Sequence, residues 1–193
     1  MKRLMDIAFS VLLMVFLLPV FVFVSVLIKT TSSGPIIFSQ KRIGRYGKEF
    51  NIYKFRTMYQ NSPANTPTHL LKNPENHITP IGRVLRKSSL DELPQLINIL
   101  LGEMSFVGPR PALYNQYDLI SKRENNGIHK VCPGITGWAQ VNGRDRLSIE
   151  EKILNDKFYV ENQSLYLDLK IVLKTVVDVF LTKGIVEGAK IDI

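Results

Sequence analysis

An almost unbroken apolar run from Ile7 to Ile28 is the strongest hydrophobic pattern in the chain, and only Ser10, Pro19 and Ser25 interrupt it. A helix of this length would reach ~33 Å, which is enough to cross a hydrocarbon core of ~30 Å. Pro19 breaks helical hydrogen bonding inside the run, and basic residues lie on both flanks. A hairpin that enters and leaves the membrane on one side fits both features. A kinked spanning helix is the alternative, because transmembrane helices tolerate proline.

Alternating apolar positions next predict a small β-hairpin, with strands over Ile36–Ile43 and Lys48–Met58 around a glycine-flanked turn. Lys54 and Arg56 are two residues apart on the second strand. They should therefore point from the same face, about 7 Å apart, a spacing that suits a diphosphate. The following segment, Asn61–His77, holds three prolines among polar residues and predicts a long loop.

Helical spacing returns in the C-terminal third, over Ile149–Glu161 and Ser164–Lys183. The second of these carries an apolar stripe opposite Lys170, Lys174 and Asp178, and the stripe consists of Leu165, Leu169, Val172, Val176 and Val179. Such a helix either packs on its own domain or lies on a bilayer surface. The glycine-rich stretch Pro133–Arg144 predicts a shaped loop. Its Trp138 is either a core anchor or a ring that faces a uracil or the membrane interface.

Two adjacent acids, Asp91 and Glu92, precede a short run of helically spaced leucines and isoleucines. We expect them at the N-terminus of that helix, where unpaired N–H groups and the helix dipole favour anions. The N-cap is either Ser89, in a capping box with Glu92, or Asp91 itself. A carboxylate can accept a phosphoryl group, its neighbour can bind a divalent cation, and nearby arginines can neutralise phosphate oxygens.

The whole chain is basic, with a formal net charge of +8 over 193 residues, although 45% of its residues are hydrophobic. Its length suits one domain with a true core. The charge predicts an anionic partner: nucleic acid, anionic lipid or a phosphorylated substrate. A single cysteine, Cys132, excludes an internal disulfide. The three histidines, His69, His77 and His129, lack zinc-site spacing, and no Walker or dinucleotide glycine pattern is present.

Four ordered motifs carry a resemblance that covers nearly the whole chain: YKFRTM (53–58), RKSSLDELPQLINIL (86–100), GEMSFVGPRP (102–111) and PGITGWAQVNGR (133–144). Together they resemble the bacterial sugar transferase family, the monotopic phosphoglycosyl transferases, in its minimal form. The fold that this implies is α+β. It combines a re-entrant helix-break-helix over residues 1–30, broken at Pro19, with a cytoplasmic catalytic domain over residues 31–193 that carries a small β-hairpin and amphipathic surface helices. Many relatives have serine before the proline, whereas this chain has Leu18.

The resemblance also implies an activity, the transfer of a sugar 1-phosphate from a UDP-sugar to undecaprenyl phosphate with Mg²⁺ as cofactor. It implies that Asp91 is the nucleophile, that Glu92 supports catalysis and the metal, and that Arg110 meets phosphate. We further expect Lys54, Arg56 and Arg86 to bind phosphate, and Arg144 and Trp138 to belong to a nucleotide or substrate loop. Asp91 and Glu92 are the expected metal ligands.

The implied location is the cytoplasmic face of the bacterial inner membrane, where membrane lipid is a partner, nucleic acid is not, and a homodimer is left open. An N-acetylated sugar is expected, because the family mostly uses such sugars. Two other hypotheses remain. In one, the transfer is direct and Asp91 is only a metal ligand. In the other, the chain is a membrane-anchored basic scaffold without catalysis, which gives no reason for paired acids among arginines.

Overall fold

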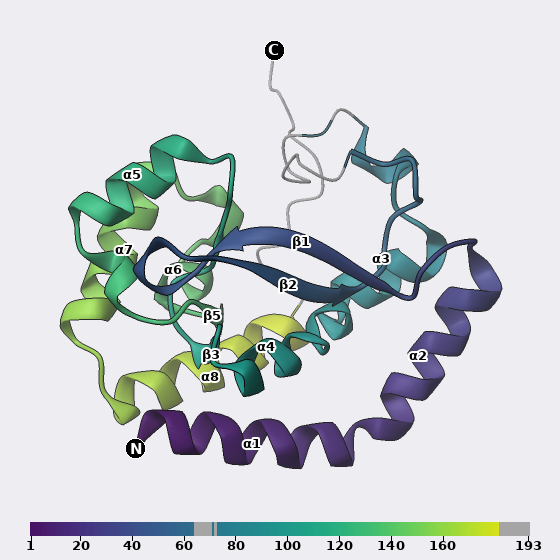
Figure 1. The fold of residues 1–193 in the computed structure, drawn as a ribbon, viewed down its shortest axis with the longest axis horizontal. Helices are drawn as coiled ribbons and strands as arrows, with labels where there is room; N and C mark the ends of the chain where they lie inside the picture. Colours follow the sequence, from purple (N-terminus) through teal and green to yellow (C-terminus); the bar gives the residue numbers. More distant parts are fainter. Residues whose placement is uncertain (64–70, 72, 182–193) are drawn as a thin grey trace.

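The computed structural model describes residues 1–63, 71 and 73–181, so His69 and the middle of the predicted proline-containing loop lie outside the described residues. The chain begins with two helices, α1 (Lys2–Phe16) and α2 (Leu18–Thr31), which meet at Leu17 and bend by 62° (Figure 1). Pro19 lies in the first turn of α2, where a missing N–H leaves no helical hydrogen bond unmade. The predicted break is therefore confirmed, and the bend itself comes two residues before the proline.

Within the described part of the chain, no single helix is long and apolar enough to cross a membrane. The bent pair α1 and α2 passes that test of length and composition only when its two helices are taken together. The re-entrant path of this pair stays a prediction, and so does the division of the chain at residue 30.

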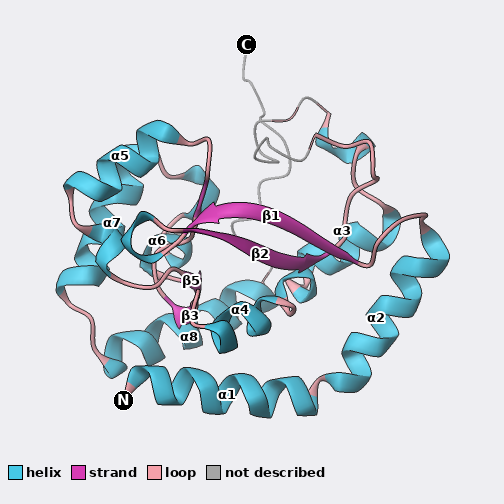
Figure 2. Cartoon of the chain, viewed as in Figure 1, coloured by secondary structure: helices cyan, strands magenta, loops and turns pink. Residues whose placement is uncertain are grey.

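The predicted hairpin is confirmed as β1 (Ile37–Ile43) and β2 (Glu49–Phe55), which pair antiparallel with Phe38 opposite Lys54. The short strand β4 (Ala112–Leu113) adds to β1, giving the order β2-β1-β4. Figure 2 shows β1 and β2 as the two long strands of this sheet. The second strand ends at Phe55 rather than Met58, so Arg56 is the first residue beyond it. Because Arg56 follows the strand, the period-two argument that paired it with Lys54 does not apply.

A second, parallel pair joins β3 (Ser105–Val107) to β5 (Gly134–Thr136). The two backbones come unusually close beyond β3. A Cβ on Gly108 would lie 2.4 Å from the carbonyl oxygen of Cys132, and a Cβ on Gly134 would lie 2.1 Å from the backbone nitrogen of Gly108. Only glycine fits at such distances, which explains why the GEMSFVGPRP and PGITG segments need these glycines. The contact fixes the Pro109-Arg110-Pro111 turn beside the start of β5.

Along the sequence, short helices lie between β2 and β3. A Thr79 cap and Pro80 begin α3 (Pro80–Lys87), and α4 (Gln95–Leu101) follows it. Between them, Leu90–Glu92 forms one 3₁₀ turn, so the dyad is not at the N-terminus of an α-helix. Neither predicted cap is present: Ser89 adopts a left-handed conformation with no side-chain cap hydrogen bond, and Pro94 is the N-cap of α4.

The C-terminal half contains α5 (Tyr117–Asn125), α6 (Trp138–Val141), α7 (Ile149–Glu161) and α8 (Leu165–Phe180). The predicted bounds of α7 are confirmed, with Ser148 and Glu151 in a capping box. The predicted loop at Pro133–Arg144 is wrong, because it contains β5 and α6. The end of the second predicted helix, at Lys183, lies outside the described residues. Further 3₁₀ turns among the described residues are Arg45–Gly47, Pro74–Asn76, Ile128–Lys130 and Arg144–Arg146.

The core extends under the bent helix pair as well as through the rest of the chain. Phe50, Leu96 and Ile99 form one buried cluster, against which Leu13 and Phe21 of the bent pair pack. Val24 and Ile28 of α2 are fully buried beside Phe55 and Leu85 in another. Helices and short strands thus make the expected α+β arrangement, and the bent pair is part of its packing.

Candidate active site

The dyad is held by the 3₁₀ turn that connects α3 to α4. Ser89 has φ = 57°, and this left-handed residue turns the chain so that both acids point inward. Asp91 and Glu92 are only 8% and 9% exposed, which is unusual for carboxylates and requires compensating charge nearby.

Glu92 is the paired member of the dyad. Its Oε1 accepts hydrogen bonds from Lys54 Nζ at 2.6 Å and from Arg110 Nη2 at 2.7 Å. Burial alone would raise the pKa of Glu92, but Arg110 and Lys54 outweigh it and hold this pKa well below its ordinary value. Glu92 is therefore ionised, and it aligns the two cations along one wall of the site.

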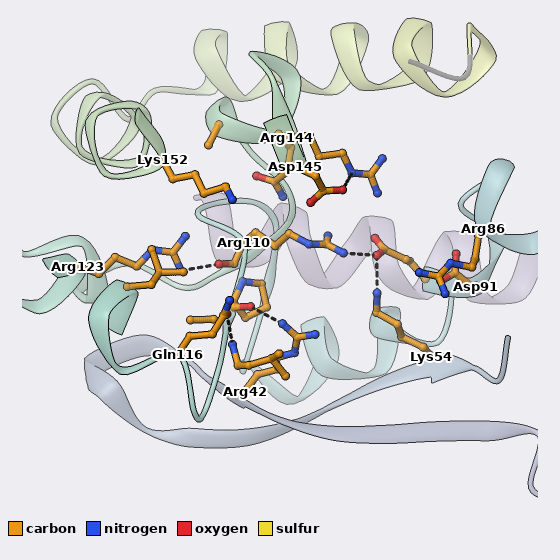
Figure 3. Close-up of a pocket in the computed structure, with 17 residues that line it drawn as sticks. Arg42, Lys54, Arg86, Asp91, Arg110, Gln116, Arg123, Arg144, Asp145 and Lys152 are labelled. Atoms are coloured by element: carbon orange, nitrogen blue, oxygen red, sulfur yellow. Dashed lines mark hydrogen bonds and ion pairs between the residues drawn. The ribbon is translucent and has the colours of Figure 1, made fainter. Parts of the chain in front are cut away.

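Asp91 has different surroundings. Arg86 lies beside its carboxylate (Figure 3), and the positive charges of Lys54, Arg86 and Arg110 all act on it. Burial raises the pKa of Asp91 to about 6, with Lys54 opposing the rise and the neighbouring Glu92 adding to it. At pH 7 the group is mostly ionised and desolvated, which are properties of a nucleophilic carboxylate.

Both acids line a cavity of about 210 Å³ with a strongly basic wall. Figure 3 shows Asp91 and Arg86 at one end, Arg110 near the middle, and Arg123, Gln116 and Lys152 toward the other end. The predicted Lys54, Arg86, Arg110 and Arg144 all line it, so the structure brings these four together around the dyad. Such a surplus of cations suits a diphosphate.

Two of the predicted site residues are placed elsewhere. Arg56 is buried, donates from Nη2 to the carbonyl and hydroxyl oxygens of Ser32, and lines a neighbouring cavity instead. Trp138 lines none of the cavities described for this chain. It lies against Phe158 of α7, with ring centroids 5.2 Å apart, and under Lys170 of α8. Trp138 therefore anchors α6 to α7 and α8.

Sequence reasoning missed several residues that line the dyad's cavity: Arg42, Gln116, Arg123, Asp145 and Lys152. Arg42 lies on β1, the partner of the strand that carries Lys54, and donates to the Pro111 carbonyl at 3.0 Å. Burial, with Arg110 adding to it, lowers the pKa of Arg42 to about 9. The sequence could have indicated Arg42, because this residue lies on the strand predicted to pair with the strand that carries Lys54.

Arg123 acts on the site through the backbone. Its Nη1 donates to the carbonyl of Arg110 at 2.6 Å, and its Nε and Nη2 both donate to Asp156 Oδ2 of α7. The pair is almost fully buried, with side-chain exposures of 5% and 1%. No local sequence pattern predicts this contact, because Arg123 and Asp156 lie on different helices.

The donor set for a metal ion is small. Among the described residues, no three His, Cys, Asp or Glu side chains cluster closely enough to hold an ion by themselves. Mg²⁺ commonly takes one or two carboxylates and completes its shell with water and substrate phosphates. Asp91 and Glu92 are the carboxylates of this cavity wall that could serve in that mode, and Glu92 Oε1 already accepts two hydrogen bonds.

Comparison with known proteins gives a consistent result. The family model described as bacterial sugar transferase matches residues 1–182. The uncharacterized sugar transferase EpsL of Bacillus subtilis (strain 168) is 42% identical over 185 residues, which cover 96% of this chain and 90% of that protein.

Two relatives with named activities have almost the same sequence identity to this chain over the residues that match. The UDP-glucose:undecaprenyl-phosphate glucose-1-phosphate transferase of Klebsiella pneumoniae is 40% identical over 190 residues, covering 95% of this chain and 41% of that protein. The UDP-N-acetylgalactosamine-undecaprenyl-phosphate N-acetylgalactosaminephosphotransferase of Aeromonas hydrophila is 40% identical over 180 residues, covering 91% and 42%. This chain thus spans about two fifths of the length of these two proteins.

Proposed function

Since the chain belongs to the bacterial sugar transferase family, we propose that it transfers a sugar 1-phosphate from a UDP-sugar to undecaprenyl phosphate and releases UMP. The observation that carries this proposal is the asymmetric dyad. Asp91 is buried beside a row of cations, while the neighbouring Glu92 is hydrogen-bonded to Lys54 and Arg110. A carboxylate in that setting can attack a phosphorus whose oxygens are neutralised by the surrounding side chains.

The reaction has two steps. An Asp91 carboxylate oxygen attacks the β-phosphorus of the UDP-sugar, the bond from this phosphorus to the bridging oxygen breaks, and UMP leaves with that oxygen. A phosphate oxygen of undecaprenyl phosphate then attacks the phosphorus of the acyl phosphate. The bond to Asp91 breaks, the carboxylate is regenerated, and the product is a polyprenyl diphosphate sugar.

The cationic side chains have different roles in this scheme. Arg110 and Lys54 are already oriented by Glu92, so they can meet the diphosphate without reorganising. Arg86, Arg144 and Arg42 line the same cavity and offset the repulsion between substrate and Asp91. Mg²⁺, held by Asp91 and substrate oxygens with Glu92 beside it, would supply further charge neutralisation when bound.

The alternatives to this scheme predict different products. If Asp91 only held a metal and transfer were direct, no phosphosugar would form on the enzyme. If the chain were a non-catalytic scaffold, neither UMP nor an adduct would form. The position of the Asp91 carboxylate among cations in the cavity, together with its raised pKa, favours covalent catalysis over both.

The sugar is left to experiment, because relatives of equal similarity are named for glucose and for N-acetylgalactosamine. We keep an N-acetylated sugar as the first hypothesis to test. We also place the chain at the cytoplasmic face of the inner membrane, where both substrates would meet, in the assembly of a surface polysaccharide or another glycoconjugate.

A panel of UDP-sugars with undecaprenyl phosphate and Mg²⁺ tests this function by UMP release. Without the acceptor, mass spectrometry of the quenched enzyme should find a phosphosugar on the peptide that contains Asp91. Asp91→Asn should abolish both signals, whereas Asp118→Asn, which changes an exposed acid on α5, should abolish neither. An adduct on Glu92, or stoichiometric UMP release without any adduct, would refute the nucleophile assignment.

A further inference from the structure

A second cavity of about 530 Å³ meets the first at the dyad. The two cavities share Arg42, Lys54, Arg86, Asp91 and Leu113, so Asp91 lies where they join. From this junction the second cavity extends along the open end of the hairpin, where β1 begins and β2 ends, and along the residues that follow β2. The first cavity extends toward Lys152 and Gln116 (Figure 3).

The walls of the two cavities differ in chemistry. Beyond the junction, the first is lined by charged side chains, including Arg110, Arg144 and Lys152. Beyond the junction, the second is lined by apolar and aromatic side chains, including Ile37, Phe38 and Tyr59, alongside uncharged polar residues and the cationic Arg56. A cavity with cations at one end and an apolar wall at the other suits an amphiphile with an anionic head.

The position of the second cavity points to the membrane side of the molecule. Pro35 and Ile37 line it, and they follow directly after α2, whose outer face carries exposed Val22, Phe23 and Val26. Arg56, also in its lining, is hydrogen-bonded to Ser32 at the end of the same helix. Ile37 and Tyr59 are 40% and 44% exposed, so the apolar wall reaches the surface near the end of α2.

We propose that this second cavity receives the polyprenyl phosphate acceptor, with its phosphate at the shared Lys54, Arg86 and Arg42 and its first isoprene units along Ile37 and Tyr59. The inference rests on the proposed function. The first cavity then holds the nucleotide side of the donor, and the two substrates use separate arms with one common phosphate position.

The chemistry of the second step agrees with a shared position. For an in-line displacement, the acceptor oxygen must approach the phosphorus opposite the Asp91 oxygen, which is the side from which UMP has left. The acceptor phosphate therefore enters the junction only after UMP has vacated it, and the same cations serve both phosphates in turn. UMP should consequently compete with the acceptor although the rest of each molecule lies in a different arm.

The test separates the two half-reactions on the full chain in detergent micelles. Exchange of labelled UMP into UDP-sugar, without acceptor, reports the donor arm alone, and complete transfer reports both arms. Ile37→Ser and Tyr59→Ser should each raise the KM for undecaprenyl phosphate about fivefold or more while leaving the exchange reaction unchanged. Leu154→Ser and Tyr117→Ser are matched controls, because both residues are exposed and line neither cavity.

A donor-arm variant gives the opposite pattern. Lys152→Gln should raise the KM for UDP-sugar in the exchange reaction and leave the KM for the acceptor unchanged. The inference is overturned if Ile37→Ser and Tyr59→Ser leave the acceptor KM at the control value, or if they impair UMP exchange instead. Failure of the proposed function is a distinct result, since the unmodified chain would then show neither exchange nor transfer.

Discussion

At the scale of single residues, Asp91 should control the pH dependence of the first half-reaction. Its pKa of about 6 means that the attacking carboxylate is lost as the pH falls below that value. The kcat/KM for UMP exchange should therefore rise about tenfold per unit up to about pH 6 and level off above about pH 7. A profile that stays flat down to about pH 5 would show that Asp91 titrates normally and that burial does not tune it.

The raised pKa of Asp91 also predicts that its ionised carboxylate lowers the stability of the folded protein. Because the folded pKa of Asp91 lies above the unfolded one, the native state binds more protons than the unfolded state between about pH 4 and 6, and stability falls as the pH rises through that window. At neutral pH the loss is complete, on the order of 3 kcal/mol for a pKa raised from 3.8 to about 6. Asp91→Asn cannot ionise, so it should raise the free energy of unfolding at pH 7 by urea denaturation. At about pH 3.5 the two proteins should differ little, and equal stability at both pH values would contradict the assignment.

The sequence singled out the two acids but did not predict how their surroundings differ. Asp91 and Glu92 were identified by their neighbours along the chain, whereas their roles depend on contacts with Lys54 on β2 and Arg110 beyond β3. The left-handed Ser89, which places the dyad in a 3₁₀ turn, violates the usual preference of a non-glycine residue. No local propensity predicts such a residue, so the expected helix cap was wrong.

At the scale of elements, local patterns predicted the hairpin and α7 well, because alternation and helical spacing are properties of the segments themselves. The helix α3 was missed although Thr79-Pro80 is a readable start signal and Ile81, Val84 and Leu85 have helical spacing, because eight residues are too few to repeat that spacing. The pairing of β3 with β5 depends on the approach of Gly108 to Gly134, which no spacing along the chain reveals.

The contact between α5 and α7 gives an element-scale prediction. Arg123 holds the Arg110 carbonyl and is itself held by Asp156, so this pair positions the turn that carries Arg110. Arg123→Lys keeps the charge but cannot make the same set of hydrogen bonds. We expect the KM for UDP-sugar to rise about tenfold in UMP exchange, while the acceptor KM stays unchanged in transfer.

A neighbouring ion pair provides the control for this prediction. Lys122 and Glu150 also join α5 to α7, but their side chains are exposed. Glu150→Gln should therefore change stability little and leave the KM for UDP-sugar unchanged. Asp156→Asn should cost more, about 3 kcal/mol, because it leaves a buried guanidinium without its counter-charge. If Arg123→Lys loses stability without any change in KM, the pair is purely structural.

At the scale of the whole molecule, the apolar surface is distributed in an unusual way. On α1 the buried residues are the polar Asp6 and Ser10, while Leu12, Val15 and Phe16 are exposed. The predicted stripe of α8 behaves similarly, because Leu167 and Ile171 pack inward and Leu165, Leu169 and Val176 stay exposed. Such contiguous apolar exposure is unfavourable in water and supports a membrane-facing surface formed by these helices.

Three polar residues tie the start of α1 to the rest of the chain. Lys2 forms an ion pair with Asp168, Arg3 donates to the Ile99 and Leu100 carbonyls, and the carboxylate of Asp6 accepts from Ser105 Oγ at 3.1 Å. A helix that carried the N-terminus across the membrane would have to break all of these contacts. The topology therefore depends on this attachment as well as on the break near Pro19.

The last prediction tests that attachment by the side from which cysteines are labelled. With Cys132 replaced by Ser, single cysteines at Met1 and at Tyr117, both highly exposed, should react with a membrane-impermeant reagent from the cytoplasmic side only. Pro19→Leu alone should leave this pattern unchanged, since the polar contacts of α1 still hold the N-terminus. Combined with Lys2→Ala and Asp6→Ala, it should expose position 1 on the opposite side, because a long apolar helix is stable as a span once its end is released. Labelling of position 1 from the opposite side in the otherwise unmodified chain would contradict the re-entrant path, and crossing by Pro19→Leu alone would show that the helix break, and not the attachment, sets the topology.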